Sequence, residues 1–230
     1  WSRGLGDVYK RQLRKYWDYE RQVAEDLLRR TAQTFPEAAD LSLRLTALFP
    51  SPPAPNITPD WQKVACALST RSAFTLITGG PGTGKTRTVA RLLALLQGVA
   101  CDSGKPLKVR LAAPTGKAAA RLSESISQAL AAEASLPKDL PTTAVTLHRL
   151  LGVIPDSRRF RHHRHNPLNA DLVIVDEASM IDLEMMAALL SALRPTTRLV
   201  LLGDKDQLAS VDAGSVLGDL CRTLTETDYP

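Results

Sequence analysis

The sequence of 230 residues predicts an α/β fold, a parallel sheet with helices on both faces, preceded by a small all-α N-terminal domain. After residue 60, short apolar runs rich in β-branched residues alternate with longer segments of helical periodicity. Before residue 50, apolar residues recur at helical spacing, and five of the 15 prolines fall within residues 50–59. Strands and helices in alternation build a parallel sheet, which binds ligands at the carboxyl ends of its strands.

The N-terminal part is expected to hold two helices. Their apolar positions are Leu13, Trp17, Ala24, Leu27 and Leu28 in the first and Leu41, Leu45 and Leu48 in the second. We therefore expect a helical domain over residues 13–50. A proline-rich linker is expected over residues 51–59, because neither a helix nor a sheet interior tolerates such a cluster.

Residues 1–12 (WSRGLGDVYKRQ) differ from the residues that follow. They show neither the apolar core of a secretory signal nor helical periodicity, so we expect a non-native leader and leave them out of the predicted fold. The first methionine is Met180, and we expect the chain to be part of a longer reading frame.

The elements of the α/β part follow in order along the chain. Strands are expected at residues 74–78, 108–113, 172–176 and 198–202, and helices near residues 85–97, 117–132 and 183–193. Thr58 and Pro59 suit a helix N-cap and first turn, and Asp182 with Glu184 places acids at a helix start.

Composition excludes two classes of protein. The chain is 44% hydrophobic and 23% charged, as in globular proteins, and its apolar runs are far shorter than the roughly 20 residues that span a bilayer. Cys66, Cys101 and Cys221 are odd in number and lack paired spacing. This argues against a disulfide framework or a zinc site and favours a reducing, cytoplasmic setting.

Charge is divided unevenly along the chain. The net charge of +5 combines +1 over residues 1–60, +11 over residues 61–170 and −7 over residues 171–230. A basic central segment suits a polyanionic ligand, and the acidic segment suits a cation. Unevenly charged, solvated loops would produce the same pattern.

A phosphate-binding loop is the strongest motif. Residues 79–86 read GGPGTGKT, directly after an apolar run and directly before a helical pattern. Such a loop turns backbone N–H groups toward phosphate oxygens, while its lysine contacts the β and γ phosphates and its hydroxyl contacts Mg²⁺. The candidate nucleotide-binding residues are Gly79, Gly80, Pro81, Gly82, Thr83, Gly84, Lys85 and Thr86.

Two adjacent carboxylates complete a candidate hydrolysis site. Asp176 and Glu177 follow the apolar run 172–175. Asp176 would hold Mg²⁺ through a bound water, together with Thr86, and Glu177 would act as general base toward the attacking water. A plain turn or cap is the alternative for adjacent acids, but the phosphate loop favours Mg-ATP hydrolysis in a P-loop NTPase. No NKxD-like tetrapeptide is present to read guanine.

Seven motifs in order resemble superfamily 1 DNA helicases, in particular the RecD-type alpha subunits of exodeoxyribonuclease V (RecBCD). They are DWQKVA at 60–65, ITGGPGTGKT at 77–86, LAAPTGKAAARL at 111–122, TLHRLLG at 146–152, RHHRHNPL at 161–168, VDEASMID at 175–182 and GDKDQLASVDAG at 203–214. The resemblance implies that residues 60–230 form the first RecA-like ATPase domain. It also implies 5′ to 3′ translocation on single-stranded DNA and RecB- and RecC-like partners in recombinational repair of broken duplex ends.

The resemblance also implies roles for single residues. Gln62 would read adenine, and Gln207 would sense the γ phosphate as a further catalytic residue. The implied DNA contacts are Pro114, Thr115, Gly116 and Lys117 in one segment and Thr146, His148 and Arg149 in another. A packed or capping histidine remains an equal alternative for His148, and residues 13–50 would dock a partner subunit.

Two questions remain open at this level. The basic run from Arg158 to His165 holds three histidines without a cysteine or acid, so a loop that contacts a polyanion or a partner is favoured over a metal site. The helicase motifs of a second RecA-like domain, including its arginine finger, are absent, so we expect the isolated chain to turn over ATP slowly. A nucleotide-dependent scaffold module and a free-standing RecD-like helicase are the alternative functions.

Overall fold

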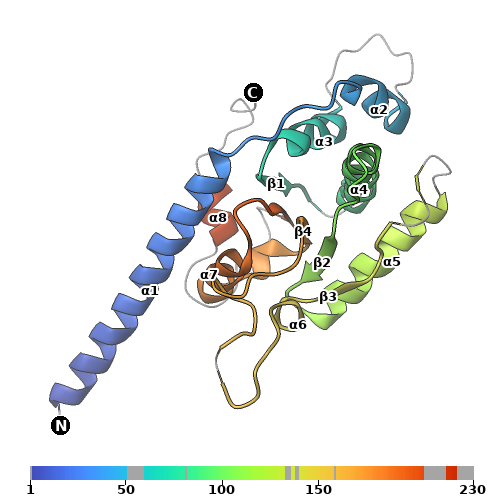
Figure 1. The fold of residues 1–230 in the computed structure, drawn as a ribbon. Helices are drawn as coiled ribbons and strands as arrows, with labels where there is room; N and C mark the ends of the chain where they lie inside the picture. The colour runs from blue at the N-terminus through green and yellow to red at the C-terminus, as the bar shows by residue number, and fades with distance from the viewer. Residues whose placement is uncertain are drawn as a thin grey trace.

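The computed structural model describes residues 2–50, 60–80, 82–132, 136–137, 140–157, 159–204 and 216–221. Five parallel strands form one sheet in the order β1-β5-β4-β2-β3 (Figure 1). The strands are β1 (Phe74–Thr78), β2 (Val109–Ala113), β3 (Ala144–Thr146), β4 (Leu172–Val175) and β5 (Arg198–Gly203). Strand β5 therefore lies between β1 and β4, so the carboxyl ends of these three strands meet at one edge.

Helices cover both faces of this sheet. They are α1 (Ser2–Thr31), α2 (Leu41–Leu48), α3 (Trp61–Arg71), α4 (Lys85–Asp102), α5 (Gly116–Ala132), α6 (Leu147–Leu151), α7 (Leu183–Ala192) and α8 (Val216–Cys221), with a short 3₁₀ helix η1 (Ala178–Met180). In β4, Val173 and Val175 pack toward the core that includes α7, whereas Leu172 and Ile174 pack toward the core that includes α4. Alternate residues of a strand point to opposite faces, so a fully apolar strand serves both cores.

The predicted α/β fold is confirmed, with differences at the element ends. The four expected strands are present within one residue at each end, and α4 continues to Asp102. Strand β3 is an unpredicted element of three half-buried residues, too short to show an alternating pattern. Asp60 caps α3, accepting hydrogen bonds from the backbone N–H groups of Gln62 and Lys63, whereas Thr58 and Pro59 lie outside the described residues.

Helix α1 differs most from the sequence-based expectation. It begins at Ser2, so the leader segment is helical from its second residue although it shows no helical periodicity, and its non-native origin stays a prediction. A helix needs no apolar stripe to extend once formed, since each added residue gains one backbone hydrogen bond. The predicted apolar face is right at Leu27, which is buried with the unpredicted Val23, and wrong at Trp17 and Leu28, which are 56% and 69% exposed. Packing on α7 selects this face.

Both N-terminal helices pack directly on the α/β part. Helix α1 runs along α7, where Gln22 donates to the carbonyl of Ala187 at 3.3 Å (Figure 1). Helix α2 contributes its buried leucines to the same core as α4. Arg198, at the start of β5, stacks over the Phe35 ring, with its guanidinium carbon 3.9 Å from the ring centroid. This contact holds the segment between α1 and α2 against the sheet. Among the described helices, none is long and apolar enough to cross a membrane.

Candidate nucleotide-binding site

The phosphate loop connects β1 to α4 and is shaped by two glycines. Gly82 and Gly84 have φ values of 77° and 83°, in the left-handed region that favours glycine. The backbone N–H of Gly79 donates to the carbonyl of Gly203 at 3.2 Å, which ties the start of the loop to the end of β5. Pro81 lies outside the described residues. The loop therefore lies at the carboxyl ends of β1 and β5, where a parallel sheet binds its ligands.

Lys85, the first residue of α4, turns back into this loop. Its ammonium donates to the carbonyls of Gly79 and Gly80, the latter at 3.0 Å. Thr86 follows it and is half-buried. Backbone N–H groups at a helix start and an ammonium inside the loop form a cradle suited to phosphate oxygens. The donors present thus fit the phosphates of a nucleotide.

Gln62 approaches the loop from α3. Its side-chain amide donates to the carbonyl of Thr83 at 3.1 Å. The approach is close, since a Cβ added to Gly84 would lie 2.6 Å from Nε2 of Gln62. Gly84 therefore allows both the left-handed turn and the contact with Gln62. Adenine recognition by Gln62 stays a prediction.

The two carboxylates follow β4, which β5 separates from β1 and the loop. Asp176 accepts a hydrogen bond from the backbone N–H of Glu177 at 2.9 Å. Burial raises the pKa of the Asp176 carboxyl, while that N–H and the Lys85 charge act in the opposite direction. Oxygen ligands of this kind suit Mg²⁺. The influence of Lys85 on Asp176 indicates that β1 and β4 bring loop and carboxylate into one site.

Glu177 has a backbone conformation that the sequence did not predict. Its φ of 53° lies in the left-handed region, where few residues other than glycine are found. Strain of this kind costs about 1–3 kcal/mol and is concentrated at functional sites. Glu177 ends the extended backbone of β4 and caps the start of η1. Ser179 of η1 is buried, and its backbone N lies next to Gly203 at the end of β5. Gln207 lies outside the described residues, and its role stays a prediction.

A family model described as an AAA domain matches residues 62–213. The chain belongs to this family. Two curated relatives named RecBCD enzyme subunit RecD are similar to it: the protein of Haemophilus influenzae is 54% identical over 73% of this chain and 27% of its own length. That of Mycolicibacterium smegmatis is 49% identical over 92% of this chain and 37% of its own length. The resemblance to RecD-type sequences is thereby confirmed.

Two further comparisons are weaker. A Deinococcus radiodurans protein named ATP-dependent RecD2 DNA helicase is 38% identical over 76% of this chain and 23% of its own length. This chain thus spans roughly a quarter to just over a third of the length of these relatives. A solved Bacteroides Pif1 bound to single-stranded DNA aligns with 74% of this chain and 37% of its own at 21% identity, with a TM-score of 0.39.

The two candidate DNA segments of the AAA domain lie side by side. Strands β2 and β3 pair in register, with Ala113 opposite Thr146, so the segments that follow them leave the sheet together. The Thr115 hydroxyl accepts from the N–H of Ala118, and the Thr146 hydroxyl accepts from the N–H of Arg149, both at 3.2 Å. Both threonines therefore act as helix caps. The segments also include Pro114, Gly116, Lys117 and His148, of which the last three are exposed.

Residues 159–165 of the basic run form part of a projecting loop between α6 and β4, and Arg158 lies outside the described residues (Figure 1). Val153 and Phe160 form an antiparallel bridge, and Asn166 closes the far end by donating to the carbonyl of Arg161 at 2.8 Å. The His148 ring packs edge-on against Phe160, with ring centroids 6.0 Å apart, although the residue is exposed. It is therefore in part a packed histidine, and it stays accessible to a ligand. Across the described residues, no cluster of three or more metal-ligating side chains occurs.

Proposed function

We propose that this chain is the ATP-hydrolysing domain of a RecD-type helicase, a 5′ to 3′ single-strand DNA translocase. The observation that supports this most directly is the joint placement of Lys85 in the phosphate loop and Asp176 within its electrostatic reach. Glu177 stands beside them in a strained turn. A lysine for phosphate, a carboxylate for the cation and a second carboxylate for water are the parts that nucleotide hydrolysis requires.

Each residue has a separate task in this mechanism. Backbone N–H groups of the loop and of the first turn of α4 hold phosphate oxygens, and Lys85 exchanges two carbonyl partners for them. Thr86 and Asp176 would hold Mg²⁺, which neutralises charge on the phosphates when bound. Glu177 accepts a proton from the attacking water. Because the loop is already shaped, little reorganisation is needed when ATP binds.

The proposed setting is an exodeoxyribonuclease V complex that repairs double-strand breaks in the cytoplasm, with RecB- and RecC-like subunits. Identities of 54% and 49% to RecBCD subunits, against 38% to a RecD2 helicase, favour the complex over a free-standing enzyme. Single-stranded DNA would cross the carboxyl ends of β2 and β3, where Lys117 and Arg149 are exposed. Gln207 would link the nucleotide to this contact.

The test replaces the proposed base in the protein assembled with its partner subunits. Glu177→Gln should abolish single-strand-stimulated ATP hydrolysis and unwinding while nucleotide affinity is retained, because the amide cannot accept the proton. Glu184→Gln is the matched control, since Glu184 bonds to Lys15 and Tyr19 on α1 and lies outside the site. Hydrolysis that survives Glu177→Gln, or is lost equally in both variants, would contradict the proposed mechanism.

A further inference from the structure

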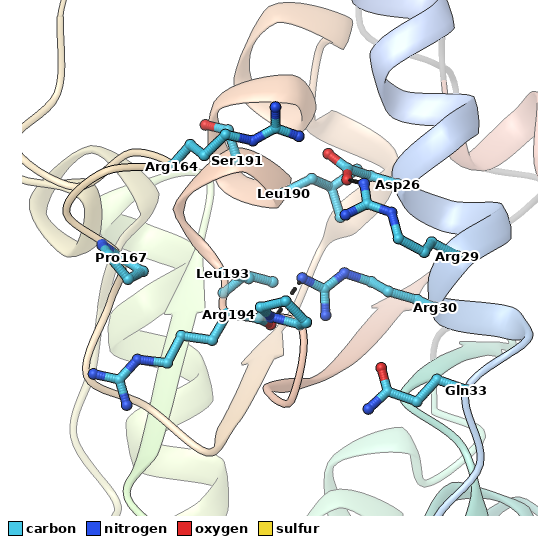
Figure 2. A pocket seen from close by; sticks show the side chains of 11 residues that line it. Asp26, Arg29, Arg30, Gln33, Arg164, Pro167, Leu190, Ser191, Leu193 and Arg194 are labelled. Atoms are coloured by element: carbon cyan, nitrogen blue, oxygen red, sulfur yellow. Dashed lines mark hydrogen bonds and ion pairs between the residues drawn. The ribbon is translucent and has the colours of Figure 1, made fainter.

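A cavity lies beside the amino-terminal end of β5, at the opposite end of this strand from the phosphate loop. It has a volume of about 330 Å³ and is bounded by the last turns of α1, the end of α7 and the segment before β4 (Figure 2). The chain leaves it through Arg194 and Pro195 and enters β5 at Arg198, whereas the phosphate loop contacts the far end of β5 at Gly203. Six residues at about 3.3 Å each separate the two places by roughly 20 Å.

The lining of this cavity is strongly basic. Four arginines line it, Arg29, Arg30, Arg164 and Arg194, against the single carboxylate of Asp26. That carboxylate is already bonded to Arg29. Figure 2 shows Arg29 and Arg30 extending from α1 toward the Leu193–Arg194 segment, with Arg164 beside Ser191 and the Arg194 side chain directed away from Arg30. In the described part of the chain, Arg30, Arg164 and Arg194 make no ion pair, so three positive charges share the cavity uncompensated.

Arg30 is the most informative of these residues. Its side chain donates to two neutral acceptors, the carbonyls of Thr197 at 2.7 Å and Arg194 at 3.2 Å, although the residue is only 6% exposed. Burial and the neighbouring Arg29 lower the pKa of this guanidinium to about 10. A buried charge is ordinarily paired with an opposite charge, because desolvation is costly. An anion that enters the cavity would supply the missing partner.

We propose that this cavity docks an acidic segment of a protein partner, with one carboxylate meeting buried Arg30 and neighbouring carboxylates meeting Arg164 and Arg194 at the rim. Guanidinium groups bind carboxylates through paired hydrogen bonds, and the Asp26–Arg29 pair places this chemistry in the same cavity. Leu190, Leu193 and Pro195 supply apolar walls, which suit a peptide side chain better than a bare phosphate.

The shape and position of the cavity disfavour a nucleic-acid strand. A single strand is held by a charged groove that follows its backbone, and this cavity is a local pocket formed by three separate segments. The exposed DNA-binding candidates also lie at the opposite edge, beyond the carboxyl ends of β2 and β3. A DNA strand held there would not meet Arg30. Docking at this cavity is therefore independent of the proposed DNA contacts.

The test measures fluorescence anisotropy of a labelled peptide, Leu-Asp-Glu-Leu-Asp-Glu, against the whole chain. Its amide analogue, Leu-Asn-Gln-Leu-Asn-Gln, serves as the uncharged control. The variant Arg164→Glu with Arg194→Glu reverses two exposed charges and leaves buried Arg30 in place. The variant Lys105→Glu with Arg14→Glu changes net charge equally at exposed positions that do not line the cavity. An oligothymidine of 12 nucleotides is the nucleic-acid probe.

We expect the acidic peptide to bind, the amide peptide not to bind, and the cavity variant to lose about tenfold or more in affinity, since two direct charge contacts become repulsive. The matched charge variant should lose less than about threefold, the change expected from long-range charge alone. Equal losses in both variants, no acidic-peptide binding, or a loss of oligothymidine affinity confined to the cavity variant would overturn the proposal. The last outcome would assign the cavity to nucleic acid.

Discussion

Three glycines of the phosphate loop allow its geometry to be tested by one substitution, alanine for glycine. Gly84 has φ of 83°, and a Cβ there would meet Nε2 of Gln62 at 2.6 Å. Gly82 has φ of 77° with open space around its Cβ position, and Gly80 has open space and no positive φ. The series therefore separates backbone strain, side-chain contact and the substitution itself.

The magnitudes follow from these differences. A left-handed alanine costs about 1–2 kcal/mol, and replacing glycine recovers about 0.4–1 kcal/mol by restricting the unfolded chain. Displacing Gln62 from its hydrogen bond to Thr83 costs about 0.5–1.5 kcal/mol. Gly84→Ala should therefore lower the free energy of unfolding by about 0.5–3 kcal/mol and Gly82→Ala by about 0–1.5, whereas Gly80→Ala, which carries neither cost, should raise it by about 0.4–1.

The assay is urea unfolding of the nucleotide-free chain, which avoids direct effects on phosphate binding. Adding Gln62→Ala to Gly84→Ala completes a double-mutant cycle and isolates the contact from the backbone strain. We expect the cost of Gly84→Ala to fall to that of Gly82→Ala when Gln62 is shortened. Equal costs at Gly80 and Gly84, or strictly additive effects in the cycle, would refute the described loop geometry.

Three further predictions test other parts of the molecule. Leu27→Ala should cost about 2 kcal/mol or more in unfolding free energy, and Leu28→Ala less than about 0.5, because only the first is buried; similar values would contradict the placement of α1. Burial raises the pKa of Asp176, so protonation favours the folded state as pH falls through that raised value. Asp176→Asn should thus match or exceed the parent's thermal stability at pH 7 while losing Mg²⁺-dependent ATP binding, and a less stable variant would argue against this burial. Burial also raises the pKa of the Cys66 thiol to about 12, and Cys221 is buried, so Ellman's reagent should modify one thiol rapidly, that of exposed Cys101; a second fast thiol in the folded protein would be inconsistent with the core.

The positions of four strands along the chain could be predicted, and candidate site residues could be proposed, because both signals are local. A phosphate loop needs glycines, a lysine and a hydroxyl within eight consecutive residues, directly between a strand and a helix. Asp176 and Glu177 likewise follow a strand that is apolar at every position. Parallel strands align their carboxyl ends, so the meeting of loop and carboxylates follows from the α/β pattern.

Other features depend on which residues meet in space. Val23 and Leu27 form the buried face of α1, although Trp17, Ala24 and Leu28 fit helical spacing as well. Both stripes are apolar enough for an amphipathic helix, so the choice rests on packing against α7. The left-handed Glu177 is also non-local, because the surrounding structure must hold a strained backbone.

By itself, the sequence determined that this chain folds as an α/β P-loop domain with a phosphate loop and two catalytic carboxylate candidates, since these depend on short-range pattern and residue chemistry. Tertiary structure alone decided the face of α1, the contact of Gln62 with the loop, and the gathering of four arginines in one cavity. Arg29 and Arg194 are more than 160 residues apart in sequence. Only the packing of α1 on α7 brings such distant charges together, because no local rule relates them.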